Sequence, residues 1–576
     1  MPAAADPASA PPATLADVAA LLSSRLLHKG KLAEAQSAIR VIGRVLHRPL
    51  SAIPADPFAL RPLIASATPG TAGITLNRWN RSRSLLSRAL AAAGIDVMPG
   101  RSTGGLSPSW SALYSRLPSK KLRYGLSRIL SFLSTEGVEP DAVNQTSFDR
   151  FADTLRTSSL HPSPEKAIRT TARLWIAAVN KVPGWPRLAP KLDPTGRSYS
   201  LPMSAFPASF IEDAEAFLQH SGNPDVLADD YAPPVAAGTI VLRRGQIRQI
   251  ASALVHSGFP IERITGLAVL VEPANAKDAL RYLLDRKGGT TTPSLGKQAQ
   301  LLRVIAKYRV KVTPADLATI TGYASGLSTK KQKGMTAKNR ERLRQFDLPE
   351  NVRKLLTMPA RVFDELRKAK ARGQKLTRRD ALRAMLALVA QILIISQMRL
   401  DNFAGLHLER HIVRHRRGRA MTVHIVIPPR ETKTVVPLEC QLNEATILLL
   451  DEYLADYHHL VSPKESAWLF PNDRGGRRCD ETFSTAFSAF ILRETGLTMH
   501  PHLFRHLAAK IWLAENPQDV ETVRQMLGHT SSATTLNAYA EIRSDSAHKR
   551  YDATLARSLE PNTAPTKPRG GKGARR

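Results

Sequence analysis

The sequence contains very little cysteine. Only Cys440 and Cys479 occur among 576 residues, and no Cys-x-x-Cys spacing is present. This scarcity argues against a disulfide framework and a cysteine-based zinc site, and it is typical of a reducing compartment. Hydrophobic residues make up 43% of the chain, enough for a core. The length predicts about three or four domains.

Long apolar runs are also lacking. No segment reaches about 18 consecutive apolar residues, the length that predicts a membrane-spanning helix. The first residues, MPAAADPASAPPATLADVAALLSS, lack the basic segment and apolar run of a secretory signal. We therefore expect a soluble, cytoplasmic protein with no membrane partner.

Acidic residues are scarce relative to basic ones. The chain has 82 Lys and Arg against 49 Asp and Glu, a formal charge of +33. Nucleic acid is the usual partner of so basic a chain, because each phosphate that Lys or Arg neutralises releases condensed counterions. A solvated basic surface is the alternative, and it suits a charge of a few units better.

Composition divides the chain into helical blocks. The Ala/Pro-rich start, 1–15, and the basic tail, 557–576, predict disordered ends. Between them, apolar residues at helical spacing are interrupted by Pro/Gly-rich breaks, which predicts helical modules. The predicted modules are 16–98, 107–190, 238–350 and 355–552.

The last of these modules contains the most informative patterns. Thr377 and Asp380 resemble a capping box at the start of a buried helix, which ends near Arg399 in SQMRLDNFAGLHL. Three short β-branched runs follow, at 411–415, 421–427 and 434–438. They predict a small antiparallel sheet with Lys433 near a hairpin tip. Helices then resume, with a break at NPQD before VETVRQMLGH.

This region holds the side chains that metal-free phosphodiester chemistry needs. Arginines bind the non-bridging phosphate oxygens, a hydroxyl attacks phosphorus, and a separate group protonates the leaving oxygen. In HPHLFRH (500–506), His502 and Arg505 are three residues apart. On a helix, both would project toward a common ligand.

An ordered series of motifs in this region resembles the tyrosine recombinases, also called the phage integrase family. The motifs are MRLDNFAGL with Arg399, ETKTVVPL with Lys433, HLFRH with His502 and Arg505, LGH with His529, and TTLNAYAEI with Tyr539. The resemblance covers roughly 355–552, and it is loose over 238–345, where it suggests a core-binding domain. It implies a multi-domain, mainly α-helical protein with a small antiparallel sheet in the catalytic domain.

The resemblance also implies a role for each matched position. Tyr539 would attack the phosphate and form a 3′-phosphotyrosyl intermediate, while Arg399 and Arg505 hold the non-bridging oxygens. The remaining roles are hydrogen bonding to the phosphate by His529, protonation of the leaving 5′-oxygen by Lys433, and proton acceptance by His502. Asp401 matches an acidic position that orients its neighbours. No cofactor, metal or ATP is implied.

Several of these residues have simpler explanations. A tyrosine such as Tyr539 is usually a core residue when it is considered alone, and Tyr551 is a rival nucleophile that lacks the LGH and TT context. Arginines at helix ends, such as Arg399, usually bind carbonyls. Hairpin lysines such as Lys433 are usually solvated, and Arg430 could reach similar space.

Three histidines, His500, His502 and His506, fall within seven residues and raise the question of a metal site. No Asp or Glu completes a recognisable ligand spacing, and His500 precedes a proline outside the expected helix. We therefore predict no metal.

The basic stretch 328–344 is expected to contact DNA phosphates. Its candidates are Lys330, Lys331, Lys333, Lys338, Arg340 and Arg342. With the catalytic domain, the 238–350 module would clamp duplex DNA. The modules at 16–98 and 107–190, the second expected to be SAM-like, would bind a second DNA site or another protein.

The sequence therefore predicts a site-specific recombinase or integrase of a mobile genetic element. It would act on double-stranded DNA at the nucleoid as a synapsed tetramer or with other recombinases. A type IB topoisomerase is one alternative, and the LGH and TT context of Tyr539 argues against it. A non-catalytic DNA-binding regulator is the other, although such a protein would normally have lost one of the matched positions.

Overall fold

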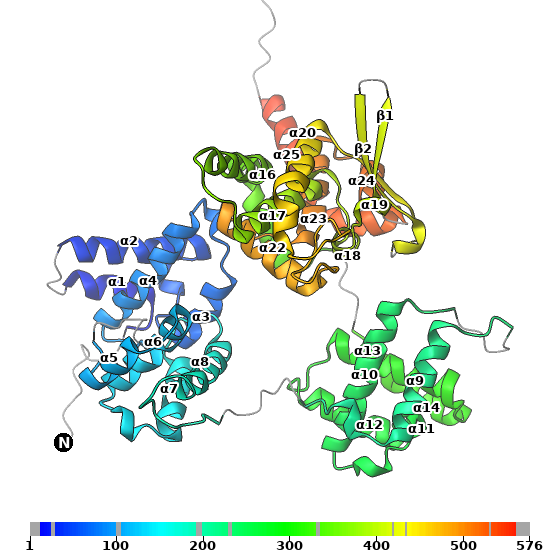
Figure 1. Cartoon of the computed structure of the whole chain (residues 1–576), viewed down its shortest axis with the longest axis horizontal. Helices are drawn as coiled ribbons and strands as arrows, with labels where there is room; N and C mark the ends of the chain where they lie inside the picture. Colours follow the sequence, from blue (N-terminus) through cyan, green and yellow to red (C-terminus); the bar gives the residue numbers. More distant parts are fainter. Residues whose placement is uncertain are drawn as a thin grey trace, which may run out of the picture. The chain divides into compact units, whose positions relative to one another are not determined.

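The computed structural model (Figure 1) describes most of the chain, and it confirms a mainly helical protein with a small antiparallel sheet. The described residues are 12–24, 29–98, 105–191, 199–227, 233–329, 334–417, 420–432, 435–528 and 531–559. Residues 1–11 and 560–576, where disordered ends were predicted, lie outside this set. No described helix is long and apolar enough to cross a membrane.

The chain forms two compact units. One combines 1–188 with 332–576, and the other is 189–331. The N-terminal modules thus share a unit with the C-terminal domain, although 143 residues of the other unit separate them in sequence.

The N-terminal part of the first unit contains two groups of helices. The first group is α1 (Leu15–Ser24), α2 (Lys29–Leu46), α3 (Pro57–Ser66) and α4 (Leu76–Ala92), and the second is α5 (Pro108–Ser115), α6 (Lys120–Thr135), α7 (Gln145–Thr157) and α8 (Pro164–Val179). The groups are joined by hydrogen bonds from Arg61 Nε to Ser159 O, 2.9 Å, and from Met98 N to Ser158 O, 2.7 Å.

Residues 1–15 were predicted to be disordered, but the ordered part of the chain begins before residue 15. Ala55 N donates to Ala13 O at 2.9 Å, and Thr14 caps the first helix by bonding the Asp17 carboxylate. These bonds satisfy backbone groups that would otherwise be unpaired, so residues 13–15 are ordered.

The unit 189–331 is a helical bundle. Its helices are α9 (Ala208–Gly222), α10 (Ala237–His256), α11 (Leu267–Val271), α12 (Pro273–Asp285), α13 (Pro293–Ile305) and α14 (Pro314–Gly326). Its bounds differ from the predicted 238–350. Phe210 and Phe217 of α9 are buried in its core, whereas α15 (Ala337–Arg344) packs on the C-terminal domain.

The C-terminal domain surrounds a long buried helix. Its larger helices are α16 (Pro349–Ala371), α17 (Arg378–Ile395), α20 (Glu444–Glu452), α22 (Asp480–Thr495), α23 (Pro501–Glu515), α24 (Val520–Leu527) and α25 (Ser532–Leu559). Thr377 and Asp380 form the predicted capping box of α17, whose apolar residues fill the core. The break at NPQD separates α23 from α24, as predicted.

The three-stranded sheet has the order β1-β2-β3 and is antiparallel throughout. Its strands are β1 (Ile412–Arg417), β2 (Ala420–Ile427) and β3 (Leu438–Gln441). The third strand was predicted at 434–438 and forms later. Val435 has a left-handed φ of 54° and Pro437 has no N–H to donate, so 435–437 do not form a strand. Lys433, which was predicted near a hairpin tip, lies outside the described residues.

Candidate active site

Helix α23 carries two of the candidate polar side chains. Pro501 is its first residue, which suits a position whose N–H needs no intrahelical partner. His502 and Arg505 lie on this helix, as predicted. Arg505 is buried, whereas His502 reaches the surface. The helix therefore fixes a buried cation behind an exposed imidazole.

Arg505 is anchored by backbone carbonyls. Its side chain is 4% exposed, and its guanidinium donates to Gln397 O and Leu527 O. Burial, followed by repulsion from Arg399, lowers the pKa of Arg505 to about 10. The group is still charged at neutral pH. The structure thus holds a cation rigidly through neutral partners that leave its charge uncompensated.

Arg399 lies close to Arg505. It is the residue before the short helix α18 (Leu400–Ala404), and both arginines line a cavity of about 290 Å³. No carboxylate lies within ion-pair distance of either arginine among the described residues. Two cations beside one cavity can bind an anion such as a phosphate.

Tyr539 lies on α25, and its side chain is only 2% exposed. Its hydroxyl is 3.2 Å from His506 Nδ1. Burial raises the pKa of Tyr539 to about 12, and nearby Arg505 opposes this shift. The phenol is therefore neutral at physiological pH and needs a proton acceptor before it can attack.

The histidines form a row of rings that leads to Tyr539. The ring centroids of His500 and His502 are 6.5 Å apart, those of His502 and His506 are 4.9 Å apart, and those of His506 and Tyr539 are 5.6 Å apart. Loss of hydration against the surrounding protein, followed by repulsion from Arg505 and Arg399, lowers the pKa of His502. His502 is therefore neutral at pH 7 and able to accept a proton.

His506 is the residue that the sequence-based assignment missed. It was weighed only as part of a possible metal site, yet it is the histidine in contact with the Tyr539 hydroxyl. Its position directly after Arg505 gives no hint of this contact, because the two partners are 33 residues apart. Among the described residues, no group of three or more His, Cys, Asp and Glu side chains could hold a metal ion.

Several predicted residues lie outside the described part of the chain. They are Lys433, His529, Lys330, Lys331 and Lys333. Arg430, the alternative to Lys433, and Tyr551, the rival of Tyr539, both lie in the described part of the chain. The side chain of Arg430 is 83% exposed, and Tyr551 is 62% exposed on α25. Asp401 pairs with Arg477 at 2.5 Å, which fixes the first turn of α18 beside Arg399.

Comparisons with known proteins concern the region that contains these side chains. Residues 364–545 match the model of the phage integrase family. A putative integrase/recombinase of Sinorhizobium fredii is 36% identical over 119 residues, 20% of this chain and 36% of that protein. Tyrosine recombinase XerC of Pseudomonas savastanoi pv. phaseolicola is 28% identical over 147 residues, 26% of this chain and 45% of XerC. The chain thus spans less than half of either relative.

Two solved structures are also similar. A lambda integrase dimer bound to a core site aligns with 58% of this chain and 95% of its own, at 15% identity and a TM-score of 0.33. The XerH recombinase bound to its difH substrate aligns with 60% and 95%, at 14% identity and a TM-score of 0.29. The C-terminal domain of the protein belongs to the phage integrase family, the tyrosine recombinases.

Proposed function

We propose that the protein is a site-specific DNA recombinase that cuts and rejoins strands through a phosphotyrosine. The observation that carries the proposal is the convergence of helices α23 and α25, which brings a buried tyrosine next to an arginine with no carboxylate partner. The electrostatic influence of Arg505 on the pKa of Tyr539 reflects this proximity. Buried charges in protein cores are usually paired with an opposite charge, so an unpaired buried arginine favours a site for an external anion.

The proposed reaction assigns one step to each group. The Tyr539 oxygen bonds to phosphorus, the bond to the 5′-oxygen breaks, and the tyrosine proton passes to His502. Lys433 protonates the leaving 5′-oxygen, while Arg399 and Arg505 neutralise the charge that grows on the phosphate oxygens. His529 adds a hydrogen bond to the same phosphate. The freed 5′-hydroxyl then attacks a partner phosphotyrosine, so the bond energy is conserved without ATP or metal.

The buried position of Tyr539 adds a requirement to this scheme. At 2% exposure its hydroxyl cannot reach a phosphate bound outside the core. We infer that α25 shifts when DNA binds and that the contact with His506 breaks. His506 thereby acts as a positioning residue that holds the nucleophile in the unbound protein.

The proposed partners follow from this chemistry. Double-stranded DNA is the substrate, and the exchange of strands requires several copies of the enzyme. These copies would form a homotetramer, or a hetero-oligomer with other recombinases, on synapsed DNA at the nucleoid. A mobile genetic element is the proposed setting, in which 16–190 adds functions beyond the catalytic domain.

The test uses nicked suicide substrates made from DNA that flanks the gene, with EDTA present. A covalent protein–DNA band on a denaturing gel is expected for wild type and for Tyr551→Phe, and its loss is expected for Tyr539→Phe. Retention of the band in Tyr539→Phe would contradict the assignment of the nucleophile. Relaxation of supercoiled DNA without strand exchange would instead indicate a topoisomerase.

A further inference from the structure

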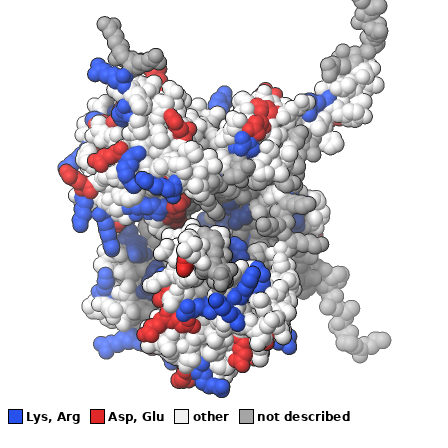
Figure 2. All heavy atoms as spheres, turned by 90° about the vertical axis from the view of Figure 1, so that its right-hand side faces the viewer, with Lys and Arg blue, Asp and Glu red and all other residues white. Residues whose placement is uncertain are grey.

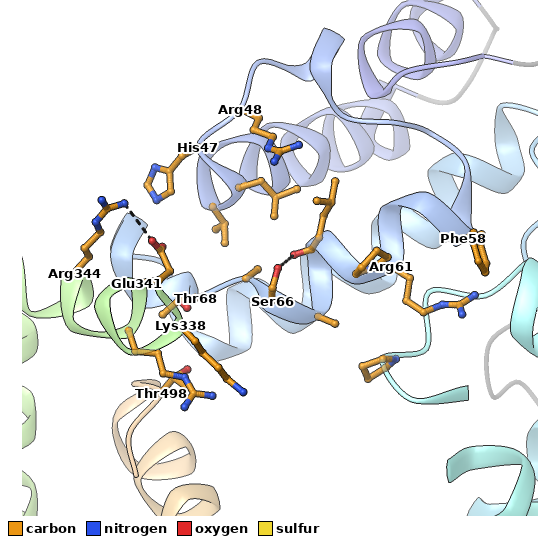
Figure 3. A pocket seen from close by; sticks show the side chains of 18 residues that line it. His47, Arg48, Phe58, Arg61, Ser66, Thr68, Lys338, Glu341, Arg344 and Thr498 are labelled. Atoms are coloured by element: carbon orange, nitrogen blue, oxygen red, sulfur yellow. Dashed lines mark hydrogen bonds and ion pairs between the residues drawn. The ribbon is translucent and has the colours of Figure 1, made fainter. Parts of the chain in front are cut away.

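A large basic cleft lies within the first unit, between the N-terminal helices and the start of the C-terminal domain. Its volume is about 1190 Å³. One wall is formed by 45–48, 58 and 61–68, and the facing wall by 338–344 with Thr498. Figure 3 shows Arg48 and Arg61 on one side and Lys338 and Arg344 on the other.

Hydrogen bonds hold the N-terminal segment against the C-terminal domain beside the cleft and also brace the 338–344 wall. Asn351 Nδ2 donates to Gly70 O at 3.0 Å, and Asn351 is 4% exposed. The Gln345 amide bonds both Thr498 O and Thr498 N, each at 2.9 Å. A Cβ at Gly70 would lie 3.0 Å from Gln345 Oε1, so the backbone of Gly70 packs closely against the Gln345 side chain. Specific contacts of the fold therefore hold the cleft in place.

The cleft differs from the mixed surface around it because its lining is mostly basic. Lys and Arg side chains are spread over the face shown in Figure 2, with Asp and Glu among them, so charge alone does not locate a binding surface. The basic residues that line the cleft are His47, Arg48, Arg61, Lys338, Arg342 and Arg344. Its one acidic lining residue, Glu341, pairs with Arg344 at 3.2 Å.

The cations of the cleft differ from exposed arginines elsewhere in the N-terminal helices. Arg81 pairs with Glu34 at 2.6 Å, and Arg150 pairs with Glu136. Within the described part of the chain, no carboxylate lies within ion-pair distance of Arg48, Lys338 or Arg342. Like charges that face one another without acids favour the binding of a polyanion.

An exposed aromatic ring adds a second feature. Phe58 lines the cleft, yet its side chain is 63% exposed. The Arg61 guanidinium lies 5.7 Å from the centroid of this ring. An apolar face beside cations suits a polymer in which sugars and bases alternate with phosphates.

The cleft also leads toward the candidate active site. Asn339, on the same helix as Lys338 and Arg342, lies 3.3 Å from His500 Nε2, and the ring of His500 stacks with that of His502. Lys338 and Arg342 add to the burial that lowers the pKa of His500. Basic groups thus connect the cleft with the site of the two arginines.

We propose that this cleft binds the phosphodiester backbone of duplex DNA, so that 45–68 of the N-terminal module adds to the DNA contacts of the catalytic domain. The proposal rests on the proposed function, because it takes DNA as the substrate. It gives the N-terminal module a DNA-binding role. It also places Lys338 and Arg342 in a cleft shared with that module.

The first test compares two charge-matched variants of the full chain. Arg48→Gln with Lys338→Gln removes two cleft cations, and Arg81→Gln with Arg150→Gln removes two paired ones. Fluorescence anisotropy with a labelled duplex of arbitrary sequence, across a salt series, measures the slope of log K against log salt. We expect the cleft variant to reduce the slope by roughly 2 and the affinity by on the order of tenfold, since each phosphate contact contributes about 0.9. The control should match wild type.

The second test looks for direct contact. Replacement of Phe58 by p-benzoylphenylalanine should crosslink to the labelled duplex under ultraviolet light. The same replacement at Tyr124, which is 62% exposed on α6, is the control and should not crosslink.

Two results would overturn the proposal. One is equal salt slopes for the cleft and control variants together with no crosslink at 58, and the other is crosslinking to single strands alone. Covalent adduct formation is measured separately. If the adduct forms while the cleft results fail, only the cleft proposal is lost. If the cleft results hold while no adduct forms, only the proposed catalysis is lost.

Discussion

Two clusters of charged residues in the C-terminal domain show how differently a protein can use arginine. In the first, Arg383 of α17 bonds Glu494 at 2.8 Å and also Glu365, and Glu494 is 7% exposed. These acids raise the pKa of Arg383. In the second, Arg505 donates to two backbone carbonyls, and burial together with Arg399 lowers its pKa.

The difference indicates which arginine can serve chemistry. A carboxylate cancels the charge of Arg383, so this arginine joins α16, α17 and α22 and contributes to stability. Carbonyls orient Arg505 and leave its charge available to an external anion. A buried arginine that lacks an acid is therefore a stronger sign of a phosphate site than an arginine in an ion-pair network.

The largest expected effect is on Arg505. Arg505→Lys keeps the positive charge and loses the planar fork that reaches two carbonyls and a phosphate. Adduct formation on suicide substrates should fall by about 100-fold to 1000-fold, as for the loss of a transition-state donor. The melting temperature serves as the control for folding. A rate within threefold of wild type would remove Arg505 from the site.

Arg383→Met is the contrasting variant. The substitution leaves Glu494 buried. Its remaining partner from another helix is Arg361, at 3.3 Å. We expect a loss of about 2 kcal/mol in the free energy of unfolding, below the range for fully buried pairs because Arg383 is partly exposed. Urea unfolding measures this loss. Unchanged stability together with a large loss of cleavage would reverse the assigned uses of the two arginines.

A smaller effect concerns pH. Burial, followed by Arg342, lowers the pKa of His500 from 6.5 to about 4. The unfolded chain therefore binds a proton on His500 more readily than the folded chain does. The free energy of unfolding should therefore decrease as the pH falls from about 6.5 to about 4. Urea unfolding from pH 7 to pH 4 should give a shallower loss for His500→Gln than for wild type, and equal slopes would contradict this account.

Local patterns predicted part of the structure. The Thr377–Asp380 capping box starts α17, and apolar residues at helical spacing fill the core as expected. The placement of His502 and Arg505 on one helix also followed from local spacing. These features depend on residues within a few turns of one another, which a sequence pattern records directly.

Contacts between distant segments could not be predicted. β-Branched residues at 434–438 suggested a strand, yet Val435 adopts a left-handed conformation and pairing begins at Leu438. The hydrogen bond between Asn351 and Gly70 spans 281 residues, and no periodicity indicates it. Tertiary packing decides such positions, and it overrides local propensity.

The most direct test of the central claim is to identify the residue that carries the DNA. The suicide-substrate adduct would be digested with nuclease and trypsin and then analysed by mass spectrometry. The tryptic peptide 525–543 contains a single tyrosine, Tyr539, whereas Tyr551 falls in the separate peptide 551–557. We expect a phosphonucleotide on peptide 525–543. A phosphonucleotide on peptide 551–557, with peptide 525–543 unmodified, would contradict it.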